Sequence, residues 1–168
     1  MKRVGFSVAI VAALGFLSNL QAAGEPAKKE EKDGKWETAD GRPTYNISAD
    51  GTVDWYTFSG FRRYHSECHV CHGPDGEGSS YAPGLMESLR TITYDDFMGV
   101  VASGREEVRA DKQSKMPPLG DNRNVMCYID DIYVYLKARA DGVLPRGRPA
   151  KRSEKPEAAE AQEKACFG

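Results

Sequence analysis

Residues 68–72 read Cys68-His69-Val70-Cys71-His72. Two thiols three positions apart lie on one turn of a helix, where both can form thioethers to the two vinyl groups of one porphyrin. The histidine that follows then has its imidazole directed at the iron. The pattern C-x-x-C-H therefore predicts one covalently bound haem c, attached through Cys68 and Cys71, with His72 as an axial ligand of the iron.

Two other kinds of site share part of this pattern. A bare C-x-x-C also occurs in zinc half-sites and in thioredoxin-like redox pairs. A zinc site needs a second ligand pair at similar spacing, and the sequence has no other C-x-x-C or C-x-x-H. A redox pair does not require the trailing histidine and is expected in a βαβ context, which the sequence lacks. Covalent haem is therefore favoured.

The first 23 residues differ from the rest of the chain. Lys2 and Arg3 precede an uncharged, mostly apolar run over residues 4–17, and small residues follow at Ala22 and Ala23. This run is shorter than the roughly 20 residues that a membrane span needs. The segment predicts a signal peptide over residues 1–23 and a periplasmic protein without a membrane span after cleavage, with an uncleaved anchor as the lesser alternative.

Composition limits what the exported chain can be. Of the 168 residues, 40% are hydrophobic and 29% are charged, which excludes wholesale disorder and a protein with many membrane spans. Without residues 1–23 the chain has 21 Lys and Arg against 25 Asp and Glu, a net charge of −4. This mildly acidic balance does not indicate nucleic acid as a partner. The length predicts one domain, and we expect a monomer.

The exported part divides into three stretches. Residues 24–43 are expected to be a flexible lead-in, since they begin with a charged run that lacks apolar periodicity. Residues 142–168 hold prolines among alternating charges and are expected to form an extended tail. Residues 44–141 are the expected folded domain, which is mainly α. A haem would give so small a domain a large apolar body to pack around.

The first half of that domain combines a turn, a helix and a loop. Strand-like runs at 44–47 and 52–55 flank a good turn and predict a β-hairpin. A helix is expected to begin near Thr57 or Ser59 and to continue into the haem motif. The Gly- and Pro-rich stretch at 73–78 must then be a loop.

The second half holds two further helices. Thr93 is the expected N-cap of a helix that ends at Ser103, and Gly104 is its natural stop. The last helix is expected over 124–140, behind a cap at Asp121 or Asn122, because its apolar residues recur at helical spacing.

The second axial ligand of the iron decides what the haem can do. Met116 is the preferred ligand because Pro117 and Pro118 stiffen its loop, and a weak thioether ligand dissociates from the iron when its loop is mobile. Met98 and Met126 lie in expected helices, where core packing suits them better. The remaining candidates are Met86, His65, His69 and Lys115.

The run from Gly60-Phe61 through the haem motif to the Tyr-rich last helix resembles a class I cytochrome c over residues 56–140. The resemblance implies that Gly60 lies against an aromatic residue of the last helix, for which we expect Tyr133. It also implies that the carbonyl of Pro83 accepts a hydrogen bond from Nδ1 of His72, which fixes the tautomer of that histidine.

A narrower resemblance rests on the block TVDWYTFSGFRRYHSECHVCHGPDGEGSSYAPGL and the two extra cysteines. It is similar to the methanol-metabolism-related four-cysteine cytochromes c, which include electron acceptors of Xox-type PQQ-dependent alcohol dehydrogenases. The resemblance implies such a dehydrogenase as electron donor and another cytochrome or an oxidase as acceptor. The two extra cysteines, Cys127 and Cys166, are expected to form a disulfide with each other. An intermolecular bridge and a free thiol are the alternatives.

Three functions compete. The first is a diffusible electron carrier, not an enzyme, in which His72 and Met116 close the iron to substrates. The second is a haem enzyme or ligand-binding haem protein with a labile Met ligand, for which His65 is the available distal residue. The third is a fixed haem subunit of a larger periplasmic complex. A basic rim that steers partners is expected from four residues near Met116, which are Arg105, Arg109, Lys112 and Lys115.

Overall fold

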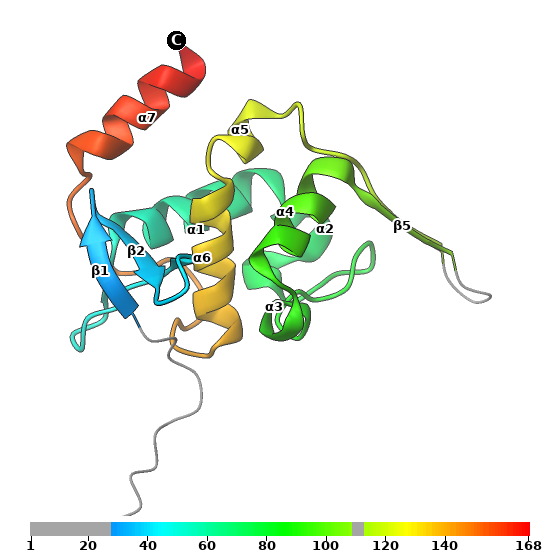
Figure 1. The fold of residues 1–168 in the computed structure, drawn as a ribbon. Helices are drawn as coiled ribbons and strands as arrows, with labels where there is room; N and C mark the ends of the chain where they lie inside the picture. Colours follow the sequence, from blue (N-terminus) through cyan, green and yellow to red (C-terminus); the bar gives the residue numbers. More distant parts are fainter. Residues whose placement is uncertain (1–27, 109–112) are drawn as a thin grey trace, which may run out of the picture.

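The computed structural model describes residues 28–108 and 113–168 (Figure 1). The expected signal peptide over residues 1–23 lies outside these ranges, as do Arg109 and Lys112 of the expected basic rim. Within the described ranges, no helix is long and apolar enough to cross a membrane.

The fold is organised around a close crossing of α1 (Trp55–Glu67) and α6 (Ile129–Ala140). Gly60 makes this crossing possible, because a Cβ atom there would lie 1.8 Å from the carbonyl oxygen of Asp131 and 2.8 Å from Cβ of Tyr135. The expected partner Tyr133 is therefore wrong. Tyr133 points to another side of α6, where its ring packs 5.2 Å from that of Phe97. Two positions along a helix turn a side chain by about 200°.

The haem motif begins directly after α1. This helix begins at Trp55, ahead of the predicted start, because the carboxylate of Asp54 caps it by accepting a 2.8 Å hydrogen bond from the amide of Thr57. Cys68 separates α1 from the short helix α2 (His69–His72). The Gly- and Pro-rich loop follows as predicted and contains one 3₁₀ turn, η1 (Pro74–Gly76).

Two helices lie between this loop and the end of the domain. The first is α3 (Ser88–Thr91), and the second is α4 (Tyr94–Ser103), which confirms the helix predicted to end at Ser103. The hydroxyl of Thr93 accepts from the amide of Asp96 at 3.1 Å, and Gly104 ends the helix with a φ of 74°. Both predicted ends of this helix are confirmed.

The predicted last helix is wrong as one continuous element. It divides into α5 (Arg123–Met126), which Asn122 caps, and α6, with the backbone of Tyr128 out of helical geometry between them. Val125 and Ile129 are both buried on either side of the break. Their spacing of four residues matches a helix, so periodicity alone does not detect the interruption.

The strands occur mostly where the sequence did not indicate them. In the stretch expected to be a flexible lead-in, β1 (Lys28–Lys32) and β2 (Lys35–Thr38) form an antiparallel sheet with β3 (Pro43–Thr44). The predicted hairpin is reduced to an antiparallel bridge between Ile47 and Val53. Its second strand, β4 (Thr52–Val53), pairs in parallel with β7 (Lys151–Arg152) instead.

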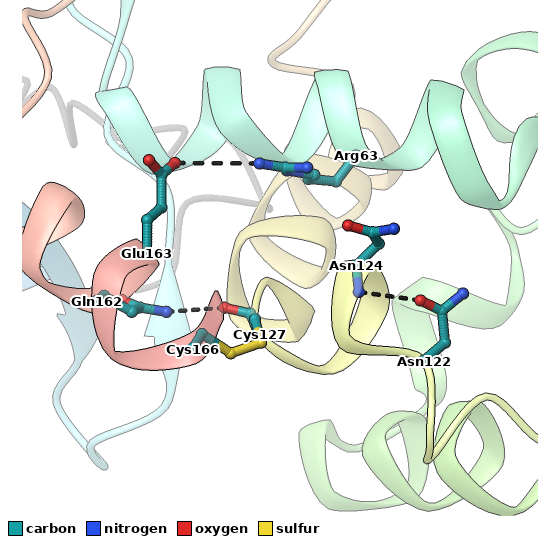
Figure 2. The surroundings of a disulfide bond; sticks show 7 residues. All are labelled: Arg63, Asn122, Asn124, Cys127, Gln162, Glu163 and Cys166. Atoms are coloured by element: carbon teal, nitrogen blue, oxygen red, sulfur yellow. Dashed lines mark hydrogen bonds and ion pairs between the residues drawn. A yellow bond between two sulfur atoms is a disulfide. The ribbon is translucent and has the colours of Figure 1, made fainter. Parts of the chain in front are cut away.

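The C-terminal stretch is folded against the domain rather than extended. After β7 it forms α7 (Glu157–Phe167). Cys166 on this helix forms a disulfide with Cys127, with Cα atoms 6.2 Å apart. Figure 2 shows Gln162 beside this bond, where its amide donates a 2.8 Å hydrogen bond to the carbonyl of Cys127. The predicted disulfide between these two cysteines is therefore present in the structure.

One further pair of strands was not predicted. The antiparallel pair β5 (Arg105–Val108) and β6 (Gln113–Met116) follows α4 and projects away from the helices (Figure 1). Its register pairs Arg105 with Met116 at the base. The candidate axial methionine is thus the last residue of a strand rather than part of an irregular loop.

Candidate haem site

A cavity of about 490 Å³ collects the residues singled out by the haem motif. Cys68, Cys71, His72, Pro83 and Met116 all line it. Its walls are apolar and come from α3, α4 and α6, through Leu89, Phe97, Val101, Ile129, Ile132 and Leu136. A large apolar cavity with a few convergent polar groups is the usual form of a cofactor site.

Neither cysteine of the motif takes part in a disulfide bond. Cys68 is half-buried and Cys71 is exposed. Burial raises the pKa of the Cys68 thiol to about 12. This environment fits a cysteine that forms a neutral thioether.

The imidazole of His72 is oriented by the backbone of a distant loop residue. Its Nδ1 lies 3.2 Å from the carbonyl oxygen of Pro83. A carbonyl can only accept, so Nδ1 carries the proton and Nε2 keeps its lone pair for a metal. The contact that the resemblance implied for Pro83 is thus present in the structure.

The loop after His72 is held by its own backbone and by Tyr64. The hydroxyl of Tyr64, which is fully buried, donates to the carbonyl of Gly73 at 2.6 Å, and the amide of Gly78 donates to the carbonyl of His72 at 2.7 Å. Gly73 has a φ of 73°, and a Cβ there would lie 2.1 Å from the carbonyl oxygen of Gly78. Only glycine fits this position.

Met116 is held by the C-terminal end of α4. Gly104 approaches the Met116 backbone so closely that a Cβ there would lie 2.6 Å from the Met116 carbonyl oxygen. The segment after Met116 is tied to the same helix, since the amide of Leu119 donates to the carbonyl of Val101 at 3.0 Å. This anchoring stiffens the segment beyond what the two prolines alone provide.

The other axial candidates differ in position. Among the described residues, Met116 is the only methionine that lines the cavity; Met86, Met98 and Met126 pack elsewhere against the core. Lys115 also lines it, but its side chain is exposed and lies 3.8 Å from Glu106. A thioether from Met116 is therefore the better fit to the apolar interior.

The two other histidines lie outside the cavity lining. The Nδ1 of His65 lies 2.8 Å from the carbonyl oxygen of Phe61, and its Nε2 lies 3.6 Å from the carboxylate of Asp75. His69 is exposed, on the side of α2 away from the lining residues. His65 therefore does not occupy the distal position that the enzyme alternative required.

The rim of the cavity is mixed in charge and partly apolar. Arg105 and Lys115 line it, and the acidic residues Glu67 and Glu107 line it too. Two exposed apolar side chains stand at the same rim, Val70 and Tyr81, which are 71% and 77% exposed. The expected basic rim is thus interrupted by carboxylates in the part of the chain that the structure describes.

Several site residues carry no signal that the sequence analysis used. The hydrogen bond from Tyr64 joins α1 to the loop after the haem motif, and the backbone contact at Gly104 depends on a strand pair that was not predicted. Tyr64 lies four residues before Cys68, so an aromatic residue one helical turn ahead of the haem motif was an available signal. The apolar walls, the two cysteines outside any disulfide and the His72 imidazole together fit a haem c.

Comparison with known proteins supports this site. No family model matches the chain. It is 58% identical over 136 residues to cytochrome c-553I of Paracoccus denitrificans, and the match spans 81% of this chain and 60% of that protein's length. It is 42% identical over 96 residues to cytochrome c-555 of Methylococcus capsulatus (strain ATCC 33009 / NCIMB 11132 / Bath), covering 56% of this chain and 72% of that protein.

These matches define the class. The chain belongs to the c-type cytochromes, carries covalently attached haem c, and has their mainly α class I fold. Within this class it is similar to the c-type cytochrome XoxG from Methylobacterium extorquens AM1. The two are 52% identical with a TM-score of 0.77, over 83% of this chain and 86% of that chain. The resemblance to methanol-metabolism-related cytochromes c is thereby confirmed.

Proposed function

We propose that this protein is a periplasmic carrier that accepts single electrons from a PQQ-dependent methanol or alcohol dehydrogenase and passes them to another cytochrome or an oxidase. The observation that carries the proposal is that His72 and Met116 line one cavity together with Cys68 and Cys71. If His72 and Met116 both bind the haem iron, no position on it would be open to a substrate.

Each residue of the site has a limited task in this function. Cys68 and Cys71 attach the haem, and the contact from Pro83 holds His72 in the tautomer that can bind iron. A thioether ligand from Met116 would raise the reduction potential relative to harder ligands. The haem supplies reversible one-electron chemistry, while the apolar walls keep water away from it.

The similarity to XoxG supports the choice of donor, because the narrower family resemblance connects such cytochromes with Xox-type dehydrogenases. The proposal also takes residues 1–23 as a signal peptide, 24–43 as a lead-in, 44–141 as the cytochrome c domain and 142–168 as a C-terminal extension. The mature protein then acts as a monomer in the periplasm.

Stopped-flow mixing tests the donor. A reduced PQQ-dependent alcohol dehydrogenase is mixed with the oxidised cytochrome, and reduction is followed by the visible haem bands. We expect fast reduction that saturates with cytochrome concentration. Absence of saturable reduction by dehydrogenases of this class would exclude the proposed donor.

Matched variants test the role of the cavity rim in the encounter. Arg105→Gln and Lys115→Gln remove exposed charges beside the cavity, whereas Arg152→Gln removes an exposed charge on β7, outside its lining. If rim charges steer the partner, only the first two variants should change the rate and its dependence on salt. Equal effects of all three variants would exclude local steering.

The oxidised absorption spectrum with and without cyanide tests the enzyme alternative. A carrier with both axial positions occupied should show little change at low cyanide concentrations. Rapid and tight cyanide binding would instead indicate a labile Met116 and favour a ligand-binding haem protein.

A further inference from the structure

A second, smaller cavity is lined by a different face of α6 from the face that lines the haem cavity. It has a volume of about 160 Å³ and is bounded by β2, β3, the start of α1 and the first turn of α6. Two oxygen atoms in its lining are buried and have no hydrogen-bond partner among the described residues. These are Oγ1 of Thr44 and Oδ1 of Asp131, whose residues are 3% and 2% exposed.

A buried carboxylate oxygen without a partner is costly when it carries charge. Ser59 hydrogen-bonds the carboxyl group of Asp131, but Oδ1 has no such contact. Burial is the main cause that raises the pKa of Asp131 to about 7, and the negative charges of Asp130 and Asp54 add to it. The position in the first turn of α6 favours the ionised form and opposes these effects.

The other charged and titratable groups around the cavity already have partners or face solvent. Lys35 lies 3.6 Å from the carboxylate of Asp130, and both are about one-third exposed. The hydroxyl of Tyr56 donates to the carbonyl of Asp33, and Glu37 is exposed. None of them neutralises Asp131 directly, although the charge of Lys35 lowers its pKa to some extent.

Asp54 is the second buried carboxylate nearby, and it differs from Asp131 in its donors. It accepts hydrogen bonds from the amide of Asn46 at 2.7 Å, and from the amide and hydroxyl of Thr57 at 2.8 Å and 2.6 Å. These three donors favour its ionised form, although burial still raises the pKa of Asp54 above its usual value. Asp131 therefore is the carboxylate in this region that is best suited to exchange a proton.

Helix α6 connects this carboxylate to the haem cavity. Ile129, Ile132 and Leu136 of α6 line that cavity, while Asp131 faces the small one. The two cavities are thus separated by about the thickness of one helix, roughly 10–12 Å including side chains. At that separation, with an effective dielectric constant of about 20, a unit change of charge alters a proton affinity by roughly tenfold.

We infer that Asp131 is a redox-linked proton site, in which reduction of the haem is accompanied by uptake of a proton from solvent at Oδ1. One electron enters at the haem and one proton joins the carboxylate, so the net charge of the protein does not change. Lys35 and Asp130, which line the small cavity and are each about one-third exposed, give the proton access to solvent. This inference depends on the covalent haem and not on which dehydrogenase is the donor.

The reduction potential of the purified holoprotein, titrated from about pH 5 to about pH 9, tests the inference. Asp131 should have a higher pKa in the reduced protein than in the oxidised protein. Between these two pKa values the reduction potential should fall as the pH rises, with a limiting slope of 59 mV per tenfold change in proton activity. Because the proton affinity of Asp131 differs about tenfold between the two redox states, the total fall in the reduction potential is limited to about 59 mV. Asp131→Asn should remove this fall, and the matched control Asp130→Asn should keep it.

Ser59→Ala provides a second test that does not require loss of the carboxyl group. Removing the Ser59 hydrogen bond destabilises the ionised form, so the pH window should move upward while its size stays the same. Redox difference infrared spectroscopy gives a direct signal, a carboxylic acid band that appears on reduction. A wild-type potential that does not vary with pH, or a variation that Asp131→Asn leaves intact, would overturn the inference.

Discussion

The disulfide between Cys127 and Cys166 allows a quantitative prediction. The bond joins residues 39 positions apart, so it closes a long loop in the unfolded chain. In the chain-entropy description a loop of this length is worth about 4 kcal/mol at 25 °C. Replacing both cysteines by serine should lower the free energy of unfolding by about that amount and the Tm by roughly 10–15 °C.

Non-covalent contacts determine what remains after the bond is removed. Around the bond in Figure 2, Gln162 keeps its 2.8 Å hydrogen bond to the Cys127 carbonyl, and Glu163 keeps its ion pair with Arg63 at 4.0 Å. Ala159 also stays buried. We therefore expect α7 to stay docked in the native state, with the visible spectrum almost unchanged, because neither cysteine lines the haem cavity.

Guanidinium unfolding followed by far-UV circular dichroism measures the effect, with the haem absorption as a second probe. The single variants Cys127→Ser and Cys166→Ser serve as internal controls, since each removes the same bond and should lose about as much stability as the double variant. A loss below about 1 kcal/mol in all three would refute the reasoning, because the cross-link would then not constrain the unfolded chain.

Three further predictions concern the site and the helix crossing. Met116→Ala should keep the haem attached but lower its potential and abolish the weak near-infrared sulfur-to-iron band, whereas the same effects in Met86→Ala would mean that the ligand is misassigned. Gly60→Ala should cost on the order of 1–3 kcal/mol in thermal unfolding because α1 and α6 must separate, while Gly99→Ala, with no atom within 4 Å of the new Cβ, should be neutral or stabilising. The folded-state pKa of Asp131 is raised from 3.8 to about 7, so the free energy of unfolding should fall as the pH rises from about 4 to about 7. The fall should be at most about 4 kcal/mol. Urea unfolding measures it, and the fall should be absent from Asp131→Asn.

The sequence predicted those parts of the molecule whose causes are local. The helix that ends at Ser103 depends on a cap and a stop within its own length, and both were visible as Thr93 and Gly104. The spacing of Cys68, Cys71 and His72 likewise places them on one cavity without reference to the rest of the chain.

The structure differs from the predictions made from the sequence where segments distant in the chain meet. The partner of Gly60 depends on how α6 is rotated about its axis, and an error of two positions chose Tyr133 instead of Tyr135. The C-terminal residues 142–168 lack an apolar pattern, and they are ordered by β7 pairing with β4 and by the disulfide. Charged composition alone predicted an extended tail because it does not report such long-range partners.

The strand pair that carries Met116 has a consequence for how such proteins can change over evolution. Its ladder begins with Arg105 opposite Met116 and extends outward to Val108 opposite Gln113. Residues added or removed beyond that last pair leave the pairing at the base untouched. A single residue inserted within β6, by contrast, shifts the register on one side of the insertion and turns those side chains to the other face. Relatives are therefore free to differ in the length of this arm at its outer end, whereas insertions between Gln113 and Met116 should be selected against.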